Sequence, residues 1–108
     1  MAIDVRSRLG ISDGDLEGLC GKWGIVRLEL FGSALREDFD LEASDIDLLV
    51  TFEEGDEWSL LDLVHMEFEF SDAIGRRVDL IERGAIEESE NYLRRKRILD
   101  SARPLYAR

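Results

Sequence analysis

The sequence predicts a single domain of α/β (α+β) class, with a small mixed β-sheet and helices packed mainly on one side of it. Segments with the two-residue period of strands alternate along the chain with segments that have the period of amphipathic helices. The 108 residues are enough for one core, and no repeat or linker divides them. An apolar fraction of 44% and a charged fraction of 36% are typical of a folded protein. We therefore expect residues 1–108 to form one domain.

The first predicted helix covers residues 13–22. Ser12 precedes it and can accept a hydrogen bond from a free N–H of the first turn. Leu16, Leu19 and Cys20 then share one face. Cys20 is the only cysteine, which excludes an internal disulfide and a cysteine-based zinc cluster. We expect Cys20 to be a small core residue.

Two further helices are expected in the second half of the chain. One helix is expected at residues 59–74, with Ser59 as a potential cap at its start and Gly75 as the stop after its end. The last helix covers residues 86–101, and Pro104 prevents its continuation. The apolar stripe of the helix at residues 59–74 is expected to contain Leu60, Leu61, Leu63, Val64, Phe68 and Ile74. The expected buried positions of the second are Ile86, Tyr92, Leu93, Ile98 and Leu99.

Three strands are expected, at residues 25–31, 45–52 and 77–82, because apolar residues alternate with other residues in each. In the second strand, Ile46, Leu48 and Val50 point one way. Its other face is expected to carry Asp45, Asp47, Leu49 and Thr51. We expect residues 105–106 to be only a short apolar tail.

The charge balance limits the classes of partner. With 25 acidic residues, 14 basic residues and a net charge of −11, the chain is poorly suited to non-specific nucleic-acid binding, although it could hold cations or a basic protein. The basic run Arg94–Arg97 is interpreted as a solvated helix face. No apolar run is long enough to cross a membrane. Met1 is not followed by a signal-like segment, so we expect a cytoplasmic protein.

Carboxylates in predicted strands are the first candidates for chemistry. Asp45 and Asp47 are two residues apart, so they would lie side by side on one face. Two such charges repel unless a cation lies between them, and Mg²⁺ prefers oxygen ligands. Asp79 also lies among apolar neighbours in a predicted strand. If that strand is beside the Asp45–Asp47 strand, three carboxylates meet on one face.

The turn after the first strand is the second candidate. Gly32 allows a ligand to approach the backbone closely. Ser33 offers a hydroxyl and an N–H where a helical turn can start, and helix starts bind phosphate. Arg36 lies one turn further along and could contact phosphate or hold the acidic loop that follows.

Each of these signals is weak alone, because an Asp-x-Asp is usually a solvated strand end and a Gly-Ser is usually a turn. Their combination predicts in-line phosphoryl or nucleotidyl transfer with two metal ions. Asp79 is the most plausible group to activate the attacking hydroxyl. His65, Trp23 and Trp58 are interpreted as structural or surface residues.

The same residues resemble a known family. The segments that carry the resemblance are Leu30-Phe31-Gly32-Ser33-x-x-Arg36, Ser44-Asp45-Ile46-Asp47-Leu48-Leu49-Val50, Val78-Asp79-Leu80-Ile81 and the tail 98–106. They are similar to the DNA polymerase β-like nucleotidyltransferase superfamily, and within it to the minimal nucleotidyltransferase (MNT) domain proteins. The resemblance covers residues 24–106 and implies the polymerase β-like fold. One difference is that residues 34–44, between Ser33 and Asp45, are one more than is usual in the family.

The resemblance implies an activity and a partner. Such proteins transfer AMP from ATP with Mg²⁺, and many are antitoxins that add AMP to a HEPN-domain ribonuclease toxin. It implies that Asp45, Asp47 and Asp79 hold the metals and that Gly32, Ser33 and Arg36 hold the nucleotide phosphates. A hetero-oligomer with the toxin is then possible. Two alternatives stay open: an antitoxin that acts by binding alone, and a nucleotidyltransferase for a small molecule such as an aminoglycoside.

Overall fold

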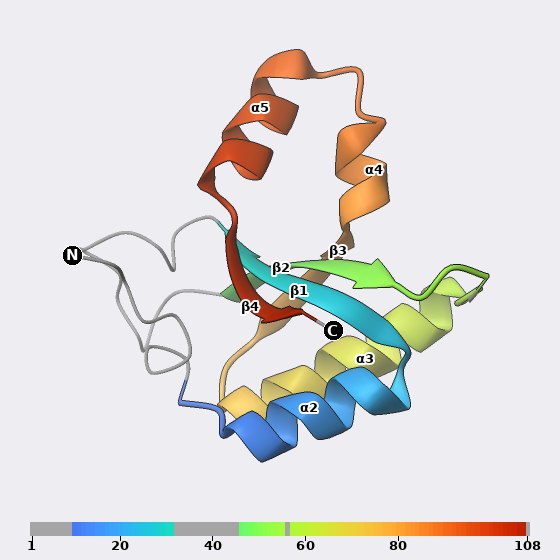
Figure 1. The fold of residues 1–108 in the computed structure, drawn as a ribbon, viewed down its shortest axis with the longest axis vertical. Coiled ribbons are helices and arrows are strands. Elements are labelled where there is room, and N and C mark those ends of the chain that lie inside the picture. Colours follow the sequence, from blue (N-terminus) through green and yellow to red (C-terminus); the bar gives the residue numbers. More distant parts are fainter. Residues whose placement is uncertain (1–9, 32–45, 56, 108) are drawn as a thin grey trace.

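A four-stranded sheet with the strand order β3-β2-β1-β4 lies at the centre of the protein (Figure 1). The computed structural model describes residues 10–31, 46–55 and 57–107. The strands are β1 (Ile25–Phe31), β2 (Ile46–Phe52), β3 (Val78–Glu82) and β4 (Arg103–Ala107). β1 pairs antiparallel with β2 and β4, whereas β2 pairs parallel with β3. The sheet is therefore mixed, and the expected α+β class is confirmed.

The strand predictions hold with one exception. β1 has the expected bounds, β3 begins one residue later than expected, and β2 begins at Ile46 because Asp45 lies outside the described residues. The tail, however, is a fourth strand, so the expectation that residues 105–106 form only a short apolar tail was wrong. Tyr106 pairs with Leu28 of β1, a contact between distant parts of the chain that two apolar residues do not reveal. β4 is an edge strand, where Pro104 is tolerated without its N–H.

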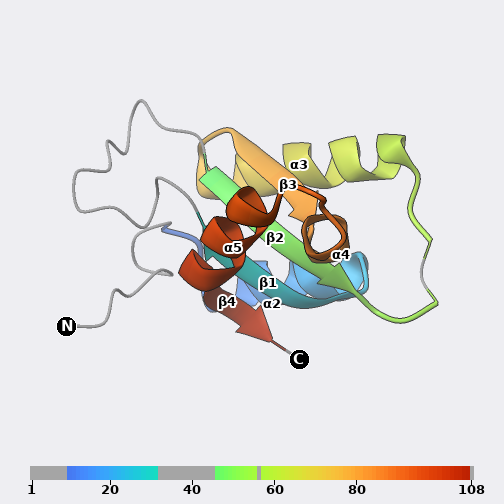
Figure 2. The same ribbon diagram turned by 90° about the horizontal axis from the view of Figure 1, so that it is seen from above.

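Helices α2 (Asp13–Lys22) and α3 (Leu60–Ile74) cover one face of the sheet (Figures 1 and 2). Ser12 accepts from the Asp15 N–H at 3.1 Å, and Ser59 and Asp62 cap each other's backbone. Gly75 ends α3 with a φ of 81°, a left-handed conformation that glycine adopts without strain. The core on this face contains Leu16, Cys20, Ile25, Leu28, Leu30, Ile46, Leu48, Val50, Met66, Phe70, Val78, Leu80 and Leu105.

The apolar stripe expected for α3 was partly wrong. Met66 and Phe70 are buried against the sheet, with Leu63 and Ile74 packed beside them. These four positions follow a helical spacing of three to four residues and define the inward face. The remaining expected residues lie away from it, and three of them are largely exposed: Leu60 (79%), Leu61 (64%) and Phe68 (66%). α3 thus has more apolar residues than the core uses.

Helices α4 (Arg83–Glu87) and α5 (Tyr92–Ser101) stand on the opposite face of the sheet (Figures 1 and 2). The single helix expected at residues 86–101 was therefore wrong. The first helix ends at its cap, Glu88. The Asn91 side chain accepts from the Arg94 N–H at 3.1 Å and caps the start of a new helix. Tyr92 and Leu93 are exposed, contrary to expectation. The smaller core on this face contains Phe31, Leu49, Ile86 and Ile98, with Ile81, Leu99 and Ala102 packed against it.

Of the helices in the described part of the chain, none has the length and apolar character needed to span a bilayer.

A polar contact joins α2 to α3 and should make stability depend on pH. Glu69 of α3 accepts a hydrogen bond from the Lys22 ammonium group and another, at 2.6 Å, from Trp23 Nε1. The bond from Lys22, and then that from Trp23, hold the pKa of Glu69 below its ordinary value. A lowered folded-state pKa stabilises the protein above the unfolded-state pKa, and this contribution is lost as the pH falls through the folded-state value.

We expect Glu69→Gln to lower the free energy of unfolding at neutral pH by about 1 kcal/mol, because the charge is close to the surface. Glutamine at this position can still accept a hydrogen bond from Trp23, so the difference in unfolding free energy between wild type and variant reports the charge of Glu69. Urea unfolding from pH 7 to pH 3 measures it, and the wild-type and variant values should converge as the pH falls. A difference that stays constant over this range would contradict the assignment to the Glu69 charge.

Candidate active site

Two carboxylates meet where β2 and β3 begin. Asp47 and Asp79 are partners in the parallel register of these strands. On its other side, Asp47 pairs with Phe31, the last residue of β1. Aligned residues of neighbouring strands point to the same face, and such strands lie about 4.8 Å apart. The two side chains therefore lie side by side, on the face that also carries Leu49 and Ile81 and that α4 and α5 cover.

The Asp79 carboxylate is accessible. Its side chain is 38% exposed, and Arg77 Nε lies 3.8 Å from its Oδ1. The Arg77 side chain is itself 75% exposed, so this ion pair is screened and weak. A ligand can thus compete with Arg77 for Asp79.

The carboxylate pair suits a hard divalent cation. Carboxylate oxygens are preferred ligands of Mg²⁺, which binds through one or two carboxylates and keeps several waters. Within residues 10–31, 46–55 and 57–107, no group of three or more His, Cys, Asp or Glu side chains is placed to hold a metal ion. The third predicted ligand, Asp45, lies outside these residues. The described pair fits a metal, and its completion by Asp45 stays a prediction.

The predicted phosphate-binding residues also lie outside the described residues: Gly32, Ser33 and Arg36. In the chain, Gly32 directly follows Phe31, the residue that pairs with Asp47. Likewise, Asp45 directly precedes Ile46, the first residue of β2. The predicted residues that are described, Asp47 and Asp79, are brought together by the register of the sheet, and their roles stay predictions.

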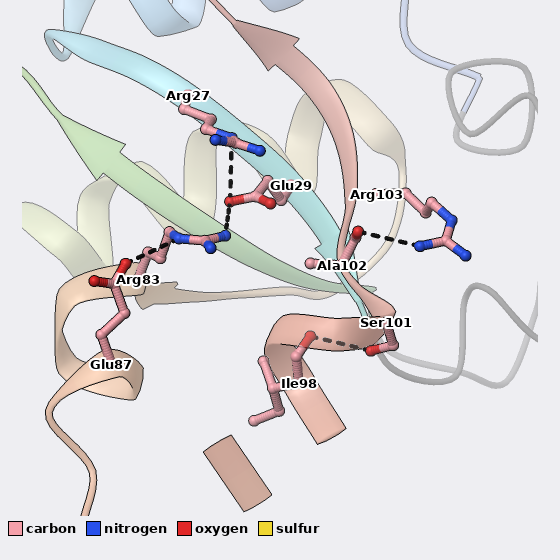
Figure 3. Close-up of polar contacts among 8 residues, drawn as sticks. All are labelled: Arg27, Glu29, Arg83, Glu87, Ile98, Ser101, Ala102 and Arg103. Atoms are coloured by element: carbon pink, nitrogen blue, oxygen red, sulfur yellow. Dashed lines mark hydrogen bonds and ion pairs between the residues drawn. The ribbon is translucent and has the colours of Figure 1, made fainter. Parts of the chain in front are cut away.

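Sequence reasoning missed a buried ion-pair network on the same face (Figure 3). Glu29 of β1 is only 2% exposed, and its Oε1 accepts from Arg83 Nη1 at 2.5 Å. Arg27 Nε lies 3.4 Å from the same oxygen, and Arg83 Nε donates to Glu87 at 2.9 Å. Burial opposes the charge of Arg83, but the contacts with Glu29 and then Glu87 raise its pKa overall.

The network fastens α4 to the sheet. Arg83 is the first residue of α4, and Glu29 lies in a central strand. A weak signal was present in the sequence, since Glu29 lies between two buried positions, Leu28 and Leu30. The alternation suggested only a solvent-facing side chain, because nothing local indicated that α4 would cover that face. The contact therefore supports the helical layer above the carboxylate face.

The mixed sheet aligns two carboxylates at the start of neighbouring strands, the arrangement that the sequence predicted for nucleotidyl transfer. The comparison with protein families identifies the group: a model described as "Nucleotidyltransferase domain" matches residues 16–105. The chain belongs to the nucleotidyltransferase domain family. The enzyme class expected from the sequence is thereby confirmed.

The relatives include minimal members of this family. A Methanocaldococcus jannaschii protein named "Putative protein adenylyltransferase MJ0435" is 41% identical over 81 residues, which cover 75% of this chain and 80% of that protein. A solved structure titled "Structure of putative minimal nucleotidyltransferase" superposes with a TM-score of 0.59 at 34% identity. That match covers 95% of this chain and 97% of the other. The resemblance to minimal nucleotidyltransferases is thus confirmed.

The fold also occurs in a toxin–antitoxin complex. A chain in the structure of tri-AMPylated Shewanella oneidensis HEPN toxin with MNT antitoxin superposes with a TM-score of 0.60 at 16% identity. The match covers 96% of this chain and 73% of the other. At this identity the likeness establishes the shared fold.

Proposed function

We propose that this protein transfers AMP from ATP to a protein acceptor, and that the acceptor is a HEPN-domain ribonuclease toxin that it neutralises. The observation that carries the proposal is the parallel register that aligns Asp47 with Asp79. The adenylyltransferase name of the archaeal relative and the AMPylated toxin in the structural neighbour support the choice of AMP and acceptor. The net charge of −11 suits a basic protein partner.

The chain's own residues have separate roles in this proposal. Asp45 and Asp47, with Asp79, would hold Mg²⁺, which supplies charge stabilisation at the phosphates and at the attacking oxygen. Gly32 and Ser33 hold the triphosphate through backbone and hydroxyl groups, and Arg36 contacts phosphate.

Asp79 is the proposed proton acceptor. The acceptor hydroxyl oxygen attacks the α-phosphorus of ATP, and the bond from that phosphorus to the leaving pyrophosphate breaks. The hydroxyl proton passes to the Asp79 carboxylate, whose partial exposure allows an acceptor to reach it. The products are the AMP ester of the acceptor and pyrophosphate.

The test combines the purified protein with ATP, Mg²⁺ and the protein encoded by the adjacent gene, where that gene encodes a HEPN-domain protein, and follows the HEPN protein by intact-mass spectrometry. We expect the HEPN protein to gain whole AMP units and to lose ribonuclease activity. The double variant Asp45→Ala/Asp47→Ala should give neither change.

Two outcomes would overturn parts of this proposal. Neutralisation by the double variant without a change in mass would replace catalysis by binding alone. Transfer of AMP to an aminoglycoside but not to the HEPN protein would replace the protein acceptor by a small molecule. An adjacent gene that encodes no HEPN protein would weaken the antitoxin role.

A further inference from the structure

A groove runs between α3 and the edge strand β3 and reaches the proposed active site. Its volume is about 410 Å³, within the usual range of about 300–1,000 Å³ for ligand pockets. Val64 and Phe68 form its apolar side, Glu67 and Ser71 contribute polar groups, and Asp79 borders it. The groove therefore joins an apolar surface to a carboxylate of the proposed site.

Phe68 gives this groove an apolar side that the fold does not need. The side chain is 66% exposed, whereas Met66 and Phe70 on the same helix are fully buried. Exposed aromatic side chains beside a cavity are common anchors for protein partners, because covering them removes apolar surface from water. Phe68 lies one helical turn from Val64, so the two form one continuous apolar wall.

The edge of β3 limits how a partner can bind. The Val78 N–H donates to Ser71 Oγ at 3.0 Å, and the Leu80 N–H donates to Glu67 Oε2 at 2.9 Å. These are backbone donors that an added strand would require. Because α3 side chains already occupy them, a partner segment must use its side chains to fill the groove.

The charges around the groove indicate the chemistry of that segment. α3 contains Asp62, Glu67, Glu69 and Asp72 and no lysine or arginine. Glu69 is already bound to Lys22 and Trp23. Glu67, whose Oε2 accepts from the Leu80 N–H, and Asp79 are the acidic residues that line the groove, against one arginine, Arg77. Such a surface is complementary to an apolar residue with basic neighbours.

We propose that the α3–β3 groove docks the acceptor protein, through an apolar side chain that packs on Phe68 and Val64 and a basic residue that faces Glu67. Docking there places a neighbouring hydroxyl of the acceptor beside Asp79. This inference rests on the proposed function, because it assigns the acceptor-binding surface of the same site.

The test compares Phe68→Ala with Leu60→Ala, an exposed apolar residue of α3 that does not line the groove. The readouts are the KM and kcat for AMP transfer to the HEPN-domain protein, and the Kd for that protein. Phe68→Ala should raise KM and Kd about tenfold, as expected for the loss of about 1.4 kcal/mol of contact, with kcat nearly unchanged. Leu60→Ala and Mg²⁺–ATP binding should show no change.

A charge variant provides an independent measurement. Glu67→Gln removes the charge of a residue that lines the groove but keeps an oxygen to accept from the Leu80 N–H. It should raise KM for the HEPN protein and weaken its dependence on salt. Circular dichroism checks that each variant keeps the wild-type fold.

The possible failures are distinguishable. If Phe68→Ala has the KM and Kd of the wild-type protein, the assignment of the groove as the docking site is overturned, whereas the proposed AMP transfer is not affected. An equal effect of Leu60→Ala would overturn the assignment to the groove in favour of the whole helix face. If the wild-type protein transfers no AMP, the proposed function fails, and docking at Asp79 for transfer fails with it; Kd then shows whether Phe68 contributes to binding alone.

Discussion

Asp79→Asn is expected to lower the rate of the proposed AMP transfer by about 10²–10⁴-fold, because asparagine cannot take up the proton that we propose passes to Asp79. Asp47→Asn should reduce the rate at least as much, since it removes the charge of a proposed metal ligand next to Asp79. The measurement is the single-turnover rate of AMP transfer at saturating Mg²⁺ and ATP. The matched control is Glu82→Gln, which removes an exposed acidic charge from the same strand as Asp79.

The same variants separate catalysis from folding. Two carboxylates side by side repel, so removing one charge in the absence of metal should leave the free energy of unfolding unchanged or raise it. Urea unfolding of the metal-free protein measures this effect. Slow transfer together with a marked loss of stability would contradict a catalytic role for the pair, as would a wild-type rate for Asp79→Asn.

Arg83→Met is expected to destabilise the protein by about 3–5 kcal/mol, because it leaves the buried Glu29 carboxylate with Arg27 as its remaining partner charge among the described residues. Glu29→Met should have a smaller effect, since the guanidinium of Arg83 keeps Glu87 as a partner and its side chain is 25% exposed. Chemical denaturation at pH 7 measures both values.

The double variant tests the origin of that loss. Replacing both partners by methionine removes the buried charge altogether, so Glu29→Met/Arg83→Met should be more stable than Arg83→Met alone. A loss in the double variant equal to the sum of the two single losses would indicate that the residues do not interact. Arg103→Met is a control, because this exposed arginine donates to the carbonyl of Ala102 and not to a carboxylate in the network (Figure 3).

Local patterns predicted the elements whose ends and faces are set by nearby residues. The bounds of β1 followed from alternation, and Ser12, Ser59 and Gly75 marked helix ends correctly. These signals depend on interactions within a few residues, which the sequence displays directly.

Elements that depend on distant contacts were less predictable. β4 is a strand because it pairs with β1, and the chain between α4 and α5 turns because Asn91 caps a second helix. The face of α3 was misjudged because leucine and phenylalanine occur on two sides of it, and only packing decides which side is buried.

The candidate site was partly accessible to sequence reasoning. The prediction that the strand of Asp79 could lie beside that of Asp47 is matched by the sheet, where the two are aligned. The Glu29–Arg83 pair was not predicted, because it joins β1 to α4 across 54 residues. The groove beside Phe68 was also missed, because predicting it requires knowing which apolar residues of α3 stay exposed after the core has packed.

The two edges of the sheet also affect how the protein behaves at high concentration. Exposed strand edges are the usual starting points for aggregation, because an unpaired N–H can recruit a strand from another molecule. On β3 the Val78 and Leu80 N–H groups are taken by α3 side chains, and on β4 Pro104 has no N–H to offer. Both edges of the described sheet are therefore protected against edge-to-edge polymerisation, which suits a protein that exposes Phe68 in the groove where we propose that the acceptor docks.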